Sequence, residues 1–384
     1  MLATTKRKRG RSRFRWTVSE LSGSLGDLGI FIPIVVGLIA VNGMNSSQLL
    51  TTFGIFFVAN GLAFGLPMPV EPMKAIAGIA IANEYAPDTI MLAGMLTGLA
   101  ILALSLTGLL TRFQKLVPKA VVRGIQMGLG ISLAVKGLTM ISRTPMLGFD
   151  SIGLAALSSI LIFVSFRRRF PATLVLVMIG AAVALMVGPE FKESSGFNLW
   201  VPAVTLPLAA DFMLSLNLSL AQLPLTLTNS LIATYGLLHV RYREKAPSIK
   251  SIGKSVGLMS SISPLIGGIG MCHGAGGVAA WHRFGARTAG SMLIFGAALM
   301  LLGVFAGSFV TGVMQAFPLS ILGTLLVLVA FELARQSKDI RRVGDVLVVA
   351  ATALVGFTYN MLAGVLIGLA VAYALQLREK RRRK

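Results

Sequence analysis

The sequence predicts an all-α membrane protein that crosses the bilayer many times, and three observations carry this prediction. Hydrophobic residues make up 55% of the 384 residues and charged residues only 13%, whereas a soluble domain has about 25% charged residues. The mean hydropathy is +0.81. Apolar runs recur from residue 22 to residue 377, with short basic or turn-rich breaks between them. Because the bilayer core offers no water to backbone polar groups, such runs are expected to be helices, which excludes a soluble enzyme or transcription factor.

Fourteen apolar segments follow one another along the chain. The first follows a basic N-terminus, the fifth and the twelfth open at Pro118 and Pro318, and the polar stretch 188–211 separates the seventh from the eighth. The third and the tenth are short and are broken by prolines and by glycines, respectively. The predicted spans are 22–41, 48–65, 67–83, 89–110, 118–137, 149–166, 170–188, 212–238, 253–267, 269–283, 287–306, 317–335, 343–357 and 359–377.

The distribution of basic residues tests this topology. The net charge of +21 would suit a nucleic-acid partner if the basic residues shared one face, but they cluster in short tracts between apolar runs, which is typical of cytoplasmic loops. The predicted inside segments contain 6–15, Arg112, Lys115, Lys119, 167–169, Arg241, Arg243, Lys245, Lys250, Lys254, Arg283, Arg287, Arg335, Lys338, Arg341, Arg342 and 378–384. The predicted outside loops contain only Lys136, Arg143 and Lys192, beside Glu84, Asp88, Asp150, Glu190 and Glu193. We therefore expect a multi-pass protein of the plasma (inner) membrane with both termini cytoplasmic, and no nucleic-acid partner.

The two halves of the chain resemble each other at an offset of 200 residues. Pro118 matches Pro318, and the broken segments around Met73 and His273 show the same offset. Seven spans per half is an odd number, so the second half must insert with the opposite orientation, as in secondary transporters built from inverted repeats. Similar composition alone is an alternative for the prolines, but the shared break argues against it. The predicted organisation is a basic segment 1–21, a first repeat 22–188, a linker 189–211, a second repeat 212–377 and a basic tail 378–384.

The broken segment 67–83 is predicted to be a half-helix that starts near the bilayer midplane. Pro67 and Pro69 forbid a regular helix before residue 72, while Pro72 suits a first turn. The 12 residues from Pro72 to Asn83 give about 18 Å of helix, roughly half a bilayer. The free N–H groups of that first turn, its helix dipole and the charge of Lys74 together favour an anion.

The matching segment 269–283 is predicted to be a second half-helix. Gly270, Gly274, Gly276 and Gly277 allow close backbone approach beside His273. By inversion the two helix starts point at each other and form one cradle for a small anion. Tight helix packing is the alternative reason for such glycines.

Few ionisable residues fall inside the predicted spans. They are Asp27, Glu71 and Lys74, with Glu332 near a span end. Each costs about 2.5–3.5 kcal/mol on insertion scales, so each should face a cavity or a partner. Glu71 and Lys74 are three residues apart and could either pair structurally or contact the ligand.

Polar groups on the first and eighth spans complete the candidate site. Ser24, Gln222, Thr226 and Asn229 could donate to an oxyanion or bond neighbouring helices. The chain contains no Walker motif and no catalytic triad, and its lone cysteine, Cys272, excludes an internal disulfide. We expect no enzyme activity, no cofactor and no metal.

Four stretches resemble a known family. GSLGDLGIFIP at 23–33, PMPVEPMKAIA at 67–77, QLPLT with NS at 222–230, and MCHGAGG with RFGART at 271–288 are similar to the molybdate transporter family related to SulP sulfate permeases. The resemblance covers nearly the whole chain and implies a fold similar to uracil permease. It implies a core domain of spans 1–4 and 8–11, a gate domain of spans 5–7 and 12–14, and a substrate between the half-helices of spans 3 and 10. One departure is Glu71, where the family usually has glutamine.

These observations predict a secondary active transporter that imports a tetrahedral oxyanion with protons by alternating access. Molybdate is expected first, then sulfate or tungstate; the alternatives are a nucleobase permease of the same fold or an anion channel. A homodimer is expected from the superfamily alone. Asp27 and Glu71 are the predicted proton-coupling residues. The predicted substrate-binding residues are Ser24, Glu71, Pro72, Met73, Lys74, Gln222, Thr226, Asn229, Cys272, His273, Gly274, Ala275 and Gly276.

Overall fold

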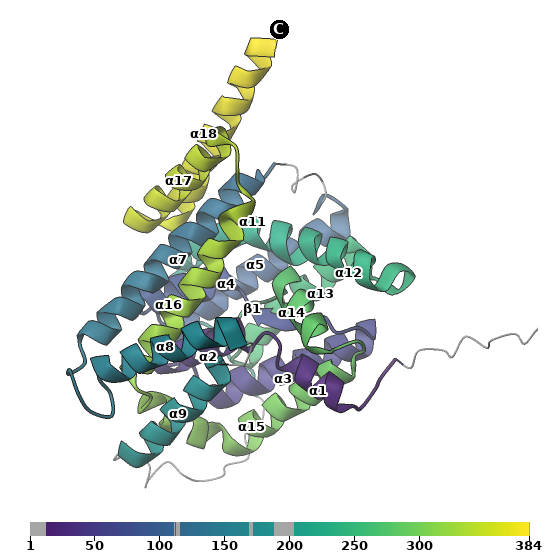
Figure 1. Ribbon diagram of the computed structural model, residues 1–384. Coiled ribbons are helices and arrows are strands. Elements are labelled where there is room, and N and C mark those ends of the chain that lie inside the picture. Colours follow the sequence, from purple (N-terminus) through teal and green to yellow (C-terminus); the bar gives the residue numbers. More distant parts are fainter. Residues whose placement is uncertain (1–12, 111, 113–115, 169–171, 188–202, 384) are drawn as a thin grey trace, which may run out of the picture.

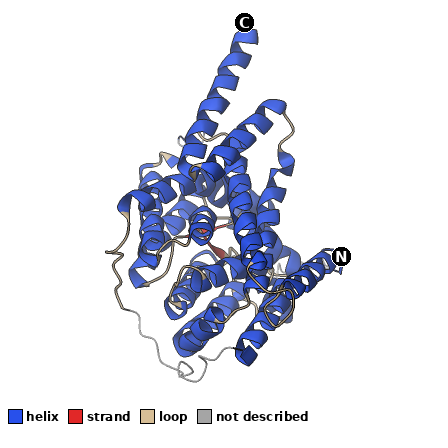
Figure 2. Cartoon of the chain, turned by 90° about the vertical axis from the view of Figure 1, so that its left-hand side faces the viewer, coloured by secondary structure: helices blue, strands red, loops and turns tan. Residues whose placement is uncertain are grey.

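A computed structural model describes residues 13–110, 112, 116–168, 172–187 and 203–383. The N-terminal basic tract up to residue 12, Lys115, Arg169 and most of the predicted linker lie outside the described residues. The rest is mostly helical and surrounds one small sheet (Figure 1; Figure 2). In the first half the elements are α1 (Val18–Ser24), α2 (Leu28–Ala40), α3 (Ser46–Phe64), β1 (Val70–Pro72), α4 (Lys74–Asn83), α5 (Pro87–Thr107), α7 (Lys119–Ser142), α8 (Ile152–Arg168) and α9 (Ala172–Val187).

The second half of the chain also contains a strand between two sets of helices. It contains α11 (Phe212–Leu225), η1 (Thr226–Ala233), α12 (Thr234–Tyr242), η2 (Arg243–Lys245), α13 (Ile249–Ile262), η3 (Ser263–Ile266), β2 (Met271–His273), α14 (Ala275–Phe284), α15 (Gly290–Gln315), α16 (Leu319–Arg335), η4 (Gln336–Asp339), α17 (Val343–Thr358) and α18 (Met361–Arg383). Each of the fourteen predicted apolar segments therefore contains at least one helix.

The helices differ in whether they are long enough to cross a bilayer. Within the described residues six helices are long and apolar enough to cross a bilayer: α3, α5, α7, α15, α16 continued through η4, and α18. Helices α1 and α2, bent by 51° relative to each other, make up to seven if they form one span. The other apolar helices are shorter, so a fourteen-span topology stays a prediction.

The all-α prediction needs one correction, because a two-stranded antiparallel sheet lies at the centre of the molecule (Figure 2). β1 pairs with β2 in the register Val70 with His273, Glu71 with Cys272, and Pro72 with Met271. The prolines before α4 and the glycines before α14 keep both segments extended, and buried backbone groups must find partners. The half-helices α4 and α14 begin directly after these strands, as the sequence predicts.

Two predicted continuous spans are interrupted in the structure. The first is broken between α1 and α2, where Gly23 and Gly26 approach the second half-helix and the residues that follow it. A Cβ on Gly23 would lie 2.2 Å from the backbone nitrogen of Ala286, and one on Gly26 would lie 2.8 Å from the carbonyl oxygen of Ala280. The eighth contains the π-helix η1, which follows Pro224, a residue that removes one helical donor. π-Helical segments are frequent at functional sites.

The helices pack in two groups. In the central group (α1–α5, α11–α15 and both strands), α3 packs along α15 and α5 along α13. In the flanking group (α7–α9 and α16–α18), α7 packs along α16 and α17, and α17 along α18. The flanking group lies on the left and at the top of Figure 1. Substantial packing between the groups runs through α2, α4, α11 and α15, whereas α1, α12 and α14 pack substantially only within the central group, as far as the described residues go.

Candidate functional site

The site is built on the starts of the two half-helices. The antiparallel register makes α4 and α14 leave the sheet at opposite ends, so the start of α4 follows the contact of Met73 with Gly270, and the Glu71 side chain reaches the first turn of α14. The N-cap residues Met73 and Gly274 make no side-chain capping bond. Helix N-termini carry free N–H groups and a partial positive charge, so the junction formed by the sheet and the two helix starts favours an anion.

Gln222 caps one of these helices and leaves the other uncapped. Its side-chain oxygen accepts from the N–H of Ala75 at 2.8 Å and of Ile76 at 3.3 Å. Its amide nitrogen donates to the hydroxyl oxygen of Thr226 at 2.9 Å, and both side chains are buried. Among the described residues, no side chain accepts from the first N–H groups of α14. The available donors of the cradle are therefore those of 275–277.

Lys74 and Glu71 form a buried ion pair at this junction. Their side chains are 7% and 3% exposed, and the lysine ammonium donates to Glu71 Oε2. A cation on the first turn opposes the dipole of its own helix. The glutamate offsets this charge. Of the two roles that the sequence allows for Glu71 and Lys74, the structure contains the structural pairing of the two side chains.

The Glu71 carboxylate also covers the first turn of α14. A Cβ on Gly274 or on Gly277 would lie 2.2 Å from Glu71 Oε1, and the one on Gly277 would lie 3.0 Å from Asp27 Oδ2. Only glycine leaves room for a carboxylate this close to the helix start. Two glycines of the second half thus receive an acid of the first half.

Asp27 and Glu71 form a carboxyl pair. Their carboxyl oxygens meet at Gly277, where a Cβ would lie close to both, and Asp27 Oδ2 and Glu71 Oε1 are buried without a hydrogen-bond partner in the described part of the chain. Two neighbouring carboxylates repel each other, so a proton on either one would lower the cost of holding both here. Lys74, Glu71 and Asp27 therefore form one charge cluster.

Other predicted site residues have structural partners. His273 contacts the carbonyl oxygen of Pro69 at 3.0 Å through Nδ1 and the hydroxyl of Ser255 at 3.2 Å through Nε2. Ser255 in turn donates to Asn60. The histidine thus ties β2 to α3 and α13, a role visible only once these distant elements meet.

Three further candidates make local contacts of their own. Ser24 donates to the carbonyl oxygen of Leu21 at 2.7 Å. Cys272 lies opposite Glu71 in the sheet, with its sulfur 3.9 Å from the carbonyl oxygen of Pro72. Asn229 lies on η1, where its carbonyl accepts from Thr234. Among the described residues no cluster of three histidine, cysteine or acidic side chains could hold a metal.

An aromatic wall that the sequence analysis missed closes the cluster on one side. Trp281 stacks on Phe57 with ring centroids 5.7 Å apart, and Phe295 meets both rings edge-on. The cavity between this wall and Asp27 measures only about 10 Å³, about the space of one water molecule. The site is therefore closed around its own carboxylates, with no room for a tetrahedral oxyanion.

The opposite face of α14 is open. Gly276 and Ala279 are exposed, and a Cβ on Gly276 would meet nothing within 4 Å. This helix packs on α1, α12 and η1. Its exposed face leads from the cradle toward the basic residues His282 and Arg283 at the helix end.

Comparison with known proteins gives the family. A family model described as a molybdate transporter of the MFS superfamily matches residues 19–133 and 215–333, which include all the candidate site residues. The chain belongs to this family. It is 30% identical to molybdate transporter 1 of Arabidopsis thaliana, over 97% of this chain and 91% of that protein. It is also 30% identical to molybdate transporter 2 of the same plant, over 94% and 88% of the two chains. The predicted family resemblance is confirmed.

Solved structures share the fold. Murine Slc26a9, described as an anion transporter in the inward-facing state, gives a TM-score of 0.70 at 14% identity, over 95% of this chain and 69% of that one. A second SLC26A9 structure gives 0.67 at 13% identity over 94% of this chain, which spans 65% of that protein's length. The transmembrane domain of the cyanobacterial bicarbonate transporter BicA gives 0.65 at 18% identity, over 92% and 96%. The chain is a polytopic membrane protein with this transporter fold.

Proposed function

We propose that the protein imports a tetrahedral oxyanion, molybdate first and sulfate or tungstate next, together with protons. The observation that carries this proposal is the buried cation Lys74 in the first turn of α4, paired with Glu71, whose carboxylate reaches the uncapped first turn of α14. Its relatives named as molybdate transporters support the oxyanion over a nucleobase. The proposed ligands are the N–H groups of 275–277 and the Lys74 ammonium, with Gln222 and Thr226 holding the start of α4.

Electrostatics make binding depend on protons. If one proton is bound by Asp27 or Glu71, their cluster with Lys74 is neutral, since one carboxylate balances one ammonium. A dianion entering beside Glu71 would be repelled, and a second proton on the pair would leave a net charge of +1 that attracts it. If protons strengthen oxyanion binding, the oxyanion must strengthen proton binding by the same factor. Asp27 and Glu71 are the proposed coupling residues on this ground.

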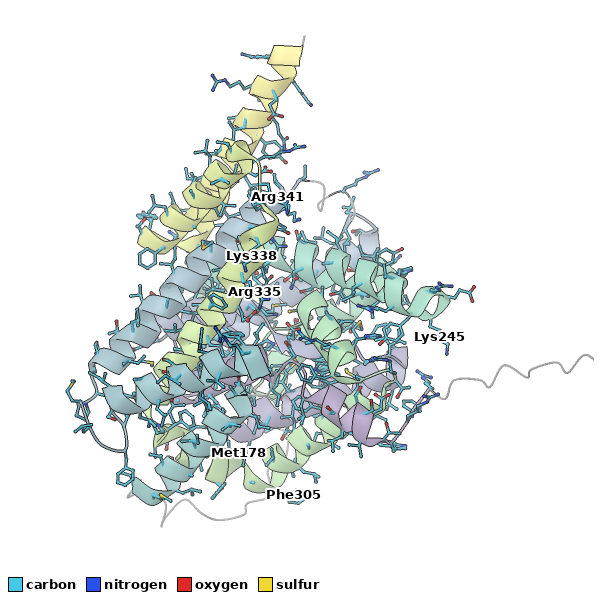
Figure 3. All side chains as sticks on the ribbon, viewed as in Figure 1. Met178, Lys245, Phe305, Arg335, Lys338 and Arg341 are labelled. Carbon is cyan, nitrogen blue, oxygen red and sulfur yellow. The ribbon has the colours of Figure 1, made fainter. Side chains whose placement is uncertain are left out.

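Alternating access would move the central group against the flanking group, as core against gate. The contact pattern supports an inward-facing arrangement, because the groups meet through α2, α4, α11 and α15 while α14 keeps an exposed face. The basic side chains Lys245, Arg335, Lys338 and Arg341 lie in the upper and right parts of Figure 3 and would face the cytoplasm, as would both termini. Met178 and Phe305, 64% and 48% exposed, lie at the lower edge and suit lipid contact. A plasma (inner) membrane location and a homodimer remain part of this proposal.

Calorimetric titration of purified protein tests the function. Molybdate, sulfate and uracil are each added to the wild-type protein and to Glu71→Gln at two pH values. We expect saturable molybdate binding, no uracil binding, and tighter binding at the lower pH in the wild type only. Uracil binding without oxyanion binding would overturn the proposal, and an unchanged pH dependence in Glu71→Gln would remove that residue from coupling.

A further inference from the structure

A second cavity lies between the two helix groups, away from the half-helix cradle. Its volume is about 380 Å³, and it is lined by the end of α4 and the start of α11 on one side and by α7 and the α17–α18 turn on the other. Asp27, Glu71, Lys74 and Gln222 do not line it. Its first lining residue on α4, Ile79, is five positions after Lys74, or about 7.5 Å along the helix from the cradle. On the predicted topology this is the outer side of the membrane.

The lining of this outer cavity suits an anion. Its one charged lining residue among those described is Lys136 on α7, whose side chain is 13% exposed. Amide groups face it from three separate elements, through Asn83, Asn217 and Asn360. A single cation with neutral donors attracts an oxyanion without the trapping effect of several charges, which a transported ligand must avoid.

In this structure Lys136 is engaged in an ion pair that joins the central and flanking groups. Lys136 belongs to the flanking group and donates to Glu84, the residue that ends α4 in the central group. Glu84 is 61% exposed, so it can leave the contact for water at little cost. The pair therefore both bridges the outer faces of the two groups and masks the charge of the cavity.

We propose that the outer cavity is a first binding station for the transported oxyanion, with Lys136 as its cation and Glu84 as a mask released when the outer side opens. This inference rests on the proposed function and adds a second site to it. The oxyanion would replace Glu84 on Lys136 and accept from the three amides before it reaches the cradle. A purely mechanical role for the ion pair, as a latch that holds the groups together, is the competing explanation.

Uptake of molybdate into proteoliposomes, measured against external concentration, separates these explanations. We expect Lys136→Gln to raise the half-saturating concentration about tenfold, the effect of losing one charge-assisted hydrogen bond. Glu84→Gln should lower it. The double variant Glu84→Lys with Lys136→Glu re-forms a latch while removing the lysine from α7, and it should not restore wild-type uptake. Rescue by this charge swap would show a latch alone and overturn the proposal.

Two controls keep the test decisive. Lys245→Gln, in the basic segment after α12 (Figure 3) and not among the residues that line the cavity, should leave the half-saturating concentration unchanged. Asn360→Cys should react with a membrane-impermeant maleimide from outside and be protected by external molybdate, since the native thiol Cys272 is buried. Absence of protection in a protein that transports molybdate would refute this station alone. Absence of any saturable molybdate binding in the wild type would instead refute the proposed function.

Discussion

Lys74 is held in the first turn of α4, at the positive end of that helix, and its ion pair with Glu71 makes this arrangement possible. Breaking a buried ion pair by removing one partner costs about 3–5 kcal/mol, because the other charge is left unpaired. We expect Lys74→Met to lower the unfolding temperature and to weaken molybdate binding by about tenfold or more. Lys74→Met combined with Glu71→Gln should recover the unfolding temperature but not the binding, as followed by thermal unfolding and calorimetry. Lys245→Met, on an exposed loop, serves as the control. Full recovery of binding in the double variant would contradict a direct role for the lysine.

Gly277 is the residue that lets the carboxyl pair reach α14. Alanine there would place its Cβ 2.2 Å from Glu71 Oε1, so the glutamate would have to move off the helix start. We expect Gly277→Ala to keep the fold, to weaken molybdate binding and to flatten its pH dependence. Gly236→Ala on α12 is the matched control, because a Cβ there meets nothing within 4 Å. Titrations at several pH values measure both variants, and an unaltered pH profile in Gly277→Ala would count against the pair as the coupling group.

The sequence identifies these charged residues better than their partners. Asp27, Glu71 and Lys74 stand out because charges are costly in apolar spans, and the structure brings all three together. The sequence cannot show that His273 is engaged by Pro69 and Ser255, since that depends on how α3, α13 and β2 meet. The exposed or buried state of a polar group in a membrane span is a property of the packed fold.

At the scale of elements, the start of α4 depends on a side chain from α11. Gln222→Leu would leave the N–H groups of Ala75 and Ile76 without their acceptor, at a cost of about 1–3 kcal/mol. Gln222→Glu keeps an acceptor, which the helix dipole favours, but adds a negative charge beside the cradle. We expect the leucine variant to lower the unfolding temperature and the glutamate variant to retain it while binding molybdate more weakly. Equal stability of the leucine variant and the wild type would remove Gln222 as the cap.

The element boundaries show where sequence patterns lose information. Three prolines before α4 and the glycines before α14 predict two half-helices; α4 begins two residues after the expected start at Pro72, and α14 begins within the predicted segment 269–283. The pairing of the two extended segments is not encoded in either one, because each supplies only half of the hydrogen bonds. The break between α1 and α2 likewise arises from close contact with α14 rather than from a proline.

At the scale of the whole molecule, the basic loops predict which side of the membrane faces the cytoplasm, and the packing of the helix groups predicts an inward-facing conformation. α14 presents Gly276 and Ala279 on an exposed face next to basic residues that the predicted topology places in the cytoplasm, while α4 is covered by α7. If this is an inward-facing state, water should reach α14 from the cytoplasm only. The chain has one native thiol, the buried Cys272, so single introduced cysteines report this directly.

We expect Ala279→Cys to react with an impermeant maleimide in inside-out vesicles and not in right-side-out ones. Leu301→Cys on α15 is the control, because this position is 59% exposed but lies in an apolar span and should face lipid, where a thiol stays protonated and unreactive. Equal labelling of Ala279→Cys from both sides would show a continuous pore, as in an anion channel. Labelling from outside alone would reverse the assigned orientation. Labelling from inside should decline under conditions that favour outward opening. Such a decline would mean that α14 becomes covered in the outward-open state, which is the movement that alternating access requires.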